Sequence, residues 1–374
     1  MLSKIVNKIK SMAIKFDCFD FNGYKPCDRN FLNNLDFCKN CKDYRQIKRH
    51  ILIIQTGAMG DVLRSTAILR RLKTSFTKIY WATKYPEILE DAKNEKFLDV
   101  IFDINDLRNV FVILSYTFDI VYNFDKDVFS CALCKQVNAK KKIGYVIDDN
   151  VVKQVPSYTT QYYRGISQKY ARENKKSYLQ EIFEMCGFVY NNEDYIISYP
   201  QNIKQNNVIT IGIKVGTGKM WKNREMSVQK IVNLINDIKN KMTCDVVLLG
   251  SHEDEDKINS ILYNFGSDSV MKKISSTYKE FVYNIASCDI IITPVTLCMH
   301  ISLGLKKPTI ILNNIFFPNE FDLFDVGYLI NVDRPCFGCY NRFCNTVNCL
   351  DSIPNDKIIE ILLKEVRKYE IYKT

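Results

Sequence analysis

One carboxylate in this chain has neighbours that suit acid–base chemistry. Asp61 follows a turn containing Gly57 and Gly60, and that turn follows an apolar run over residues 51–54. Glycine permits a sharp turn or a close approach of the backbone to a bound molecule. A carboxylate beside such a turn can take a proton from a hydroxyl group within hydrogen-bond reach, which is general base catalysis. The simpler interpretation is that Asp61 is a helix N-cap, where aspartate is favoured.

A second group of residues could bind an anion. A turn at residues 216–218 follows the apolar segment 208–215 and precedes Lys219, Lys222 and Arg224. Backbone N–H groups and cations in such a loop can hold phosphate and stabilise charge that develops on a departing group. A basic cluster of this kind is also typical of a solvated loop.

Cysteine is enriched, with 14 residues, and eight of them form two groups. The spacings are C-x8-C-x10-C-x2-C before the first apolar strand and C-x2-C-x4-C-x4-C after the last one. Four thiolates suit structural zinc or iron in tetrahedral geometry. The predicted ligands are Cys336, Cys339, Cys344 and Cys349, with a second candidate set of Cys18, Cys27, Cys38 and Cys41. For the second set, two separate pairs, reduced thiols or pairing with the first set are alternatives.

These residues require a scaffold of parallel strands. Residues 51–54 are apolar on both faces, as in a strand covered by helices, and a helical period runs over 62–72. Further strands are predicted at 78–83, 118–123, 142–147, 208–215, 245–249, 289–293 and 308–312. Helices are predicted at 178–186, 228–241, 254–263, 277–287, 297–305 and 355–369. This alternation predicts an α/β fold of two Rossmann-like domains, with ligands bound at the strand ends.

The predicted organisation has six consecutive segments. The boundary between the domains is placed in a polar, proline-marked stretch without periodicity. The segments are a cysteine-containing amino-terminal extension (1–49), a Rossmann-like domain (50–197), a linker (198–207), a second Rossmann-like domain (208–333), a cysteine finger (334–352) and a terminal helix (353–374).

Composition limits the class of protein. With 374 residues, 47% hydrophobic and 25% charged, the chain is typical of a soluble globular protein. No apolar run approaches the roughly 18 residues of a membrane span, and lysines replace the apolar core of a signal peptide, so we expect a cytoplasmic protein. The net charge of +10 favours an anionic ligand or surface. The basic amphipathic start would allow peripheral contact with the inner face of a membrane, or docking on the protein itself. No nucleic-acid-binding motif is present, so no nucleic acid partner is expected.

The order of these motifs resembles glycosyltransferase family nine, the heptosyltransferase family. The resemblance is carried by the turn 57–62 and the segment 293–304, with supporting pieces at 125–127, 142–144, 212–224, 248–253 and 276–277. It implies the B-type glycosyltransferase fold, in which two Rossmann-like domains face each other across a cleft. The amino-terminal domain would hold the acceptor and the other domain a nucleotide-sugar of the ADP- or GDP-heptose type.

The resemblance also implies roles for individual residues. Family members are inverting enzymes that need no metal for transfer, and Asp61 matches their general base. The acceptor or phosphate turn is matched by Gly57, Gly60 and Arg64. The donor-binding positions are matched by Lys214, Gly216, Thr217, Lys222, Arg224, Glu253, Ser276, Thr296, Met299 and His300. A helix start would let His300 donate to phosphate, although a lone histidine is more often ordinary packing.

Two departures from the family pattern concern the donor. Arg224 replaces the usual lysine, and Val295-Thr296-Leu297 replaces the usual Asp-Thr-Gly. Three interpretations are open: the donor sugar differs, its contacts have moved to Glu253 with Lys222 and Arg224, or transfer activity has been lost.

The predicted function is inverting transfer of a sugar, with heptose favoured, to a hydroxyl of a lipopolysaccharide-core sugar or of a protein serine or threonine. The cysteine finger resembles that of bacterial autotransporter heptosyltransferases, iron-binding relatives that modify protein hydroxyls and assemble as rings, which implies a homo-oligomer. The alternative is a catalytically silent, metal-stabilised scaffold or assembly subunit. A nicotinamide oxidoreductase is disfavoured because the 57–60 turn lacks the G-x-G-x-x-G spacing.

Overall fold

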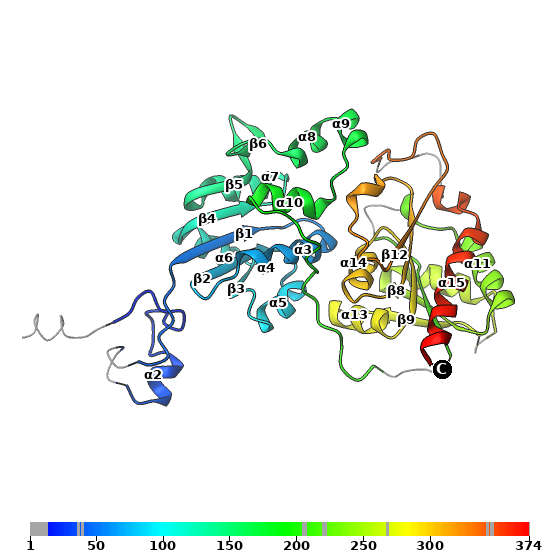
Figure 1. The fold of residues 1–374 in the computed structure, drawn as a ribbon, viewed down its shortest axis with the longest axis horizontal. Helices are drawn as coiled ribbons and strands as arrows, with labels where there is room; N and C mark the ends of the chain where they lie inside the picture. Colours follow the sequence, from blue (N-terminus) through cyan, green and yellow to red (C-terminus); the bar gives the residue numbers. More distant parts are fainter. Residues whose placement is uncertain are drawn as a thin grey trace, which may run out of the picture. The chain divides into compact units, whose positions relative to one another are not determined.

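The chain forms two β-sheets, each flanked by helices in an α/β arrangement (Figure 1). The computed structural model describes residues 14–35, 38, 41–203, 208–218, 223–266, 269–341, 344 and 348–373. Each sheet has six strands, and all strand pairs are parallel except one antiparallel pair at an edge. The predicted α/β fold with two Rossmann-like sheets is confirmed.

The first sheet has the strand order β3-β2-β1-β4-β5-β6. Its strands are β1 (Arg49–Ile54), β2 (Thr77–Thr83), β3 (Val100–Asp103), β4 (Thr117–Asn123), β5 (Asn138–Asp148) and β6 (Val151–Val155). The central strand β1 is apolar on both faces, and Ile51 pairs with Ile79 on one side and Ile120 on the other. The strand order reverses at β1, so the loop that follows β1 lies at a topological switch point, where ligands bind in such sheets. The helices of this part include α6 (Leu107–Ser115) and α7 (Val128–Gln136), whose apolar sides complete the core.

The segment after β1 is less regular than predicted. The expected single helix is divided into α3 (Met59–Ser65), a 3-10 turn (Thr66–Ile68) and α4 (Leu69–Leu72). The Thr66 hydroxyl donates to the Leu63 carbonyl at 2.6 Å and also accepts from the Ile196 N–H at 2.8 Å. Such side-chain bonds compete with the helical backbone pattern, which accounts for the break. The N-cap residue of α3 is Ala58, so the interpretation of Asp61 as an N-cap is wrong.

The second sheet has the strand order β12-β11-β10-β7-β8-β9. Its strands are β7 (Thr210–Lys214), β8 (Asp245–Ser251), β9 (Met271–Ser275), β10 (Ile290–Pro294), β11 (Thr309–Asn313) and β12 (Gly327–Asn331). Every residue of β7, β10 and β11 is buried. Because the order reverses at β7, the loops after β7 and β10 meet at the switch point of this sheet. Its main helices are α11 (Val228–Lys241), α12 (Glu255–Leu262), α13 (Tyr278–Ala286), α14 (Leu297–Gly304) and α15 (Asn355–Lys373).

Three shorter helices lie between the sheets in sequence: α8 (Thr160–Ile166), α9 (Gln168–Glu173) and α10 (Tyr178–Cys186). Ser177 caps α10 with a reciprocal capping box, and Gly187 ends this helix in a left-handed conformation, φ +81°. A further short helix, α2 (Asp28–Leu32), precedes the first sheet. Within the described residues, no helix is long and apolar enough to cross a membrane.

Contacts divide the chain into two compact units that interleave along the sequence. Residues 58–67 and 87–91 belong with 158–374, and the remaining residues form the first unit. Helix α3, which carries Asp61, therefore packs with the second unit. These two units are not contiguous in the sequence, so they do not test the predicted domain boundaries. Those boundaries stay a prediction.

Candidate active site

Asp61 forms a close ion pair within α3. Its Oδ1 lies 2.6 Å from Nη2 of Arg64, three residues later on the same helix face. The Asp61 side chain is 35% exposed whereas that of Arg64 is 13% exposed, so the carboxylate meets solvent and the guanidinium is largely covered. The guanidinium lies 3.4 Å from the ring centroid of Tyr178 on α10. Burial opposes the charged form of Arg64, yet the charge of Asp61 keeps its pKa above the ordinary value.

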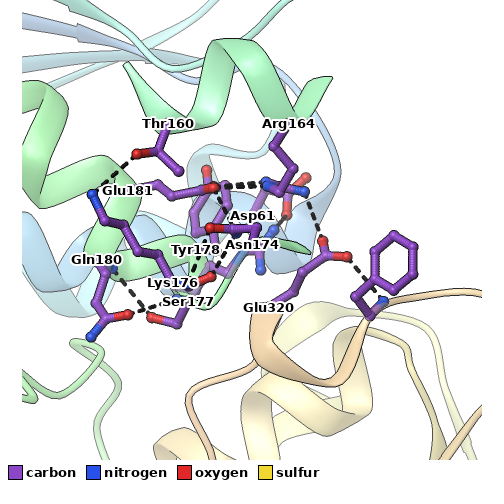
Figure 2. A network of polar contacts seen from close by, with 12 residues as sticks. Asp61, Thr160, Arg164, Asn174, Lys176, Ser177, Tyr178, Gln180, Glu181 and Glu320 are labelled. Carbon is purple, nitrogen blue, oxygen red and sulfur yellow. Dashed lines mark hydrogen bonds and ion pairs between the residues drawn. The ribbon is translucent and has the colours of Figure 1, made fainter. Parts of the chain in front are cut away.

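A network of buried charges supports α10 (Figure 2). Arg164 of α8 donates to both carboxylate oxygens of Glu181, over distances of 2.8 to 3.0 Å. It also donates to Glu320 at 3.0 Å, and Asn174 donates to Glu181 at 3.1 Å. Burial raises the pKa of Glu320, although Arg164 acts in the opposite direction. The sequence interpretation missed this network, whose members share no spacing pattern.

Helix α14 approaches α3 at Gly60. A Cβ atom on Gly60 would lie 2.5 Å from Cδ2 of His300, so only glycine allows this approach. His300 is the fourth residue of α14, near the helix start as expected, but it is only 7% exposed. Burial lowers the pKa of His300 far below its usual range, and Arg64 and Arg224 lower it further, so the imidazole is neutral at pH 7. Among the described residues, its Nδ1 is a buried atom without a hydrogen-bond partner.

Arg224 connects the loop after β7 to the turn before α14. Its Nη1 donates to the Val295 carbonyl at 2.5 Å, and the residue is 9% exposed. Burial lowers the pKa of Arg224 to about 10, whereas the negative charge of Asp61 acts in the opposite direction. Arg224 therefore carries its charge at pH 7 within electrostatic range of Asp61. The structure thus brings together four of the predicted residues, Asp61, Arg64, Arg224 and His300.

Other predicted donor residues make internal contacts. Nζ of Lys214 lies 2.8 Å from Oδ2 of Asp254, with both side chains 10% exposed. A Cβ atom on Gly216 would lie 1.7 Å from Oδ1 of Asp254, so this carboxylate requires a glycine there. The N–H of Thr217 donates to Glu225 at 3.2 Å. Carboxylates of the protein therefore contact Lys214, Gly216 and Thr217, at the end of β7 and the start of the loop that follows it. Lys222 lies outside the described residues.

The remaining predicted donor residues differ in burial. Glu253 and Ser276 are exposed after β8 and β9, and the Ser276 hydroxyl bonds to Nε2 of His252 at 2.9 Å. Thr296 is the N-cap residue of α14, with its hydroxyl 3.2 Å from that of Thr293. Met299 is fully buried and packs with Val295, Leu303 and Ile311 in a small apolar cluster. The role of Met299 in the structure is therefore packing.

The glycine turn after β1 is held by Asp125. The Gly57 N–H donates to Oδ2 of Asp125 at 2.7 Å, the Thr56 N–H donates to the same oxygen, and Gln55 Nε2 donates to Oδ1 at 2.6 Å. A Cβ atom on Gly57 would lie 2.8 Å from Oδ1. This glycine therefore accommodates a carboxylate of the protein, and the amide groups that could have met a ligand phosphate are satisfied internally.

The cysteine groups are less compact than a metal centre requires. Among the described residues, no three His, Cys, Asp or Glu side chains are gathered as a ligand set. In the carboxy-terminal set, Cys349 is buried and Cys336 is exposed. Burial raises the pKa of Cys349; Arg334 acts in the opposite direction, and the thiols of Cys336, Cys339 and Cys344 raise it further.

Comparison with solved structures identifies the fold. A family 9 glycosyltransferase from Veillonella parvula matches with a TM-score of 0.65 at 12% identity, covering 86% of this chain and 98% of that one. The Escherichia coli ADP-heptose lipopolysaccharide heptosyltransferase II matches with a TM-score of 0.63 at 14% identity, covering 86% and 99%. The dodecameric iron-containing heptosyltransferase TibC from enterotoxigenic E. coli, in complex with ADP-D-β-D-heptose, matches with a TM-score of 0.53 at 9% identity, covering 86% and 76%.

Comparison of sequences alone gives no relatives. No protein-family model matches the chain, and no curated protein matches it. At these low identities, the structural matches establish that the chain has the fold of family 9 glycosyltransferases.

Proposed function

We propose that this protein is an inverting glycosyltransferase that uses a nucleotide-sugar donor, with Asp61 as general base. The observation that carries the proposal is the cluster in which the partly exposed carboxylate of Asp61 lies within electrostatic range of the buried cation Arg224. Because residue 60 is glycine, the neutral side chain of His300 packs against α3, the helix that carries Asp61. The fold shared with heptosyltransferases supports this interpretation.

In the proposed reaction, Asp61 takes the proton of an acceptor hydroxyl as its oxygen bonds to the anomeric carbon of the donor sugar. The bond from that carbon to the nucleoside diphosphate breaks, and the diphosphate leaves with the electron pair. A single displacement inverts the anomeric configuration, and a positioned base contributes about 10²–10⁴-fold. Arg224 and His300 would stabilise the charge that develops on the leaving phosphate. Arg64 would hold the Asp61 carboxylate in position.

The substrates belong to the proposal. A donor of the ADP- or GDP-heptose type is supported by the solved complex of TibC with ADP-heptose. The acceptor would be a lipopolysaccharide-core sugar or a protein serine or threonine. Cytoplasmic localisation, a homo-oligomer and peripheral membrane contact through the basic start of the chain also remain proposals. Residues 1–13 of that start lie outside the described residues.

A structural zinc or iron ion is a further part of the proposal. The ligands would be Cys336, Cys339, Cys344 and Cys349, and the ion would cross-link the segment after β12. Support comes from the soft, thiolate-rich donor set that these four cysteines offer within one short segment. The ion would have no role in sugar transfer.

Substitution of the proposed base tests the function. We expect Asp61→Asn to abolish transfer of labelled sugar from ADP-heptose while ADP affinity, measured by calorimetry, stays within a few-fold. Asp256→Asn is a matched control, because Asp256 is an exposed aspartate in the first turn of α12. Full transfer by Asp61→Asn would contradict the assignment of the base.

The alternative is a catalytically silent scaffold. The buried side chains of Val295 and Met299, in a segment matched to donor binding, favour it. Calorimetric titration with ADP and GDP separates the two proposals. Binding heat that is lost in Arg224→Met supports the enzyme, whereas no binding of either nucleotide supports the scaffold.

A further inference from the structure

Two adjoining cavities lie beside the proposed active site and have no part in the proposed reaction. The larger one, of about 540 Å³, lies between the start of α10, the loop 318–323 and the end of β12. The smaller one, of about 250 Å³, shares four lining residues with it: Tyr190, Asn192, Asp322 and Leu323. The larger volume is within the range of small-molecule sites.

The lining of the larger cavity combines amides with apolar surface. Gln180, Asn192, Asn319 and Asn331 contribute amide side chains, and Phe321 contributes an aromatic ring. An amide can donate and accept hydrogen bonds at the same time. This mixture suits a molecule whose hydroxyl groups both donate and accept and whose C–H faces are apolar.

The charges around the cavities disfavour a phosphate. The smaller cavity is lined by Asp194, Asp322 and Asp325, and its one cation, Lys306, is paired with Asp194. In the larger cavity the charged residues are Asp322 and Lys175. The excess of carboxylates in the smaller cavity would repel an anion, and the larger cavity has one charge of each sign and therefore no net attraction for one. Carboxylates accept hydrogen bonds well from neutral hydroxyl groups.

The cavity is connected to the Asp61 ion pair through two adjacent residues, Ser177 and Tyr178. The Ser177 hydroxyl donates to Oδ1 of Asp322 at 2.6 Å, and Ser177 lines the larger cavity. The next residue, Tyr178, is the ring on which the Arg64 guanidinium rests. Figure 2 draws Ser177, Tyr178 and Gln180 from the start of α10 together with Asp61.

We propose that the larger cavity is a saccharide subsite that binds a neutral, hydroxyl-rich unit of the substrate through the amides of Gln180, Asn192 and Asn331. Its assignment to the acceptor glycan rests on the proposed transferase function. Occupation of the subsite would place a sugar chain against the same helix start that supports Asp61 through Tyr178 and Arg64.

Ligand-observed saturation-transfer NMR with maltotriose tests binding without any need for turnover. We expect signals for the wild type and for Asp61→Asn, and no competition by inorganic phosphate. In Gln180→Trp a lining amide is replaced by a bulky ring, and in Asn192→Gly the amide is removed while the positive φ of 59° is kept. Each should weaken binding about ten-fold, equivalent to about 1.4 kcal/mol.

The control is Gln229→Trp, at an exposed position on α11, which should bind as the wild type does. Circular dichroism should show that both cavity variants remain folded. The subsite is refuted if the wild type gives no signal, or if both cavity variants bind maltotriose normally. Because the assay reads binding alone, failure of sugar transfer would refute the proposed function and leave this result intact.

Discussion

The buried ion pairs of Arg164 predict a large loss of stability when its charge is removed. In Arg164→Met, Glu181 and Glu320 lose hydrogen bonds of 2.8 to 3.0 Å while their side chains stay 0% and 9% exposed. Breaking a buried pair costs about 3–5 kcal/mol because the remaining charge is uncompensated. Since Arg164 itself is 12% exposed, we expect the lower end, about 3 kcal/mol. With an m value of about 3 kcal/mol/M, the urea midpoint should fall by about 1 M.

Circular dichroism during urea unfolding measures this shift. The control is Arg108→Met, which removes an ion pair to Asp106 from an arginine that is 89% exposed. Exposed pairs contribute little, so the midpoint should stay nearly unchanged. Adding Glu181→Leu to Arg164→Met should recover part of the loss, because the uncompensated charge is then gone. Equal shifts in Arg164→Met and Arg108→Met would refute the argument that burial makes the pair costly.

Three further predictions concern packing, pH and metal. Gly60→Ala should lower the free energy of unfolding by about 1–3 kcal/mol in urea, because the added methyl group overlaps the facing histidine; Gly266→Ala, in open space, should not. Burial raises the pKa of Glu320 above its ordinary value of 4.5, so the folded state holds the Glu320 proton more tightly than the unfolded state does. The free energy of unfolding should therefore fall as pH rises above 4.5 toward the folded-state pKa, and urea unfolding measured across pH should show a smaller fall in Glu320→Gln. Protein purified without added ions should contain zinc or iron by elemental analysis, which Cys336→Ser with Cys339→Ser should remove; a stable, metal-free wild type would contradict the site.

The sequence predicts the interior of both sheets and misses their edges. The four strands absent from the prediction, β3, β6, β9 and β12, are the edge strands of the two sheets. A central parallel strand is covered on both faces and reads as a continuous apolar run. An edge strand needs no such run and often carries charge, as in β9, whose Met271 and Lys272 are exposed. Continuous apolar runs in the sequence therefore identify the central strands of each sheet but not the edge strands.

The division of the helix after β1 depends on a contact that local sequence does not contain. Residues 62–72 keep a helical period, yet the chain breaks at Thr66. The hydroxyl of Thr66 is engaged by the backbone of Ile196, which is 130 residues away. A tertiary contact of this kind overrides a local period, and only the fold reveals it.

The candidate site shows the same limit. Asp61 and its glycines are adjacent in sequence, so their spacing indicates a turn and a base. Arg164 and Glu320 are 156 residues apart and lie in no motif. A charge network of this kind forms from side chains that the fold brings together, and no pattern in the sequence predicts which arginine meets which carboxylate.

The two departures from the family pattern turn out to be neighbours. Arg224 stands where the family usually has lysine, and Nη1 of Arg224 donates to the carbonyl of Val295, which stands where the family usually has aspartate. A guanidinium group has several N–H donors in a rigid plane, so it can donate to a carbonyl and still present other N–H groups to an anion. An ammonium group is a compact point charge without this fixed geometry. The apolar side chain of Val295 packs in the core and leaves its carbonyl facing Arg224. The two substituted positions are therefore coupled by a hydrogen bond, so replacing Arg224 by lysine should also alter the turn at Val295.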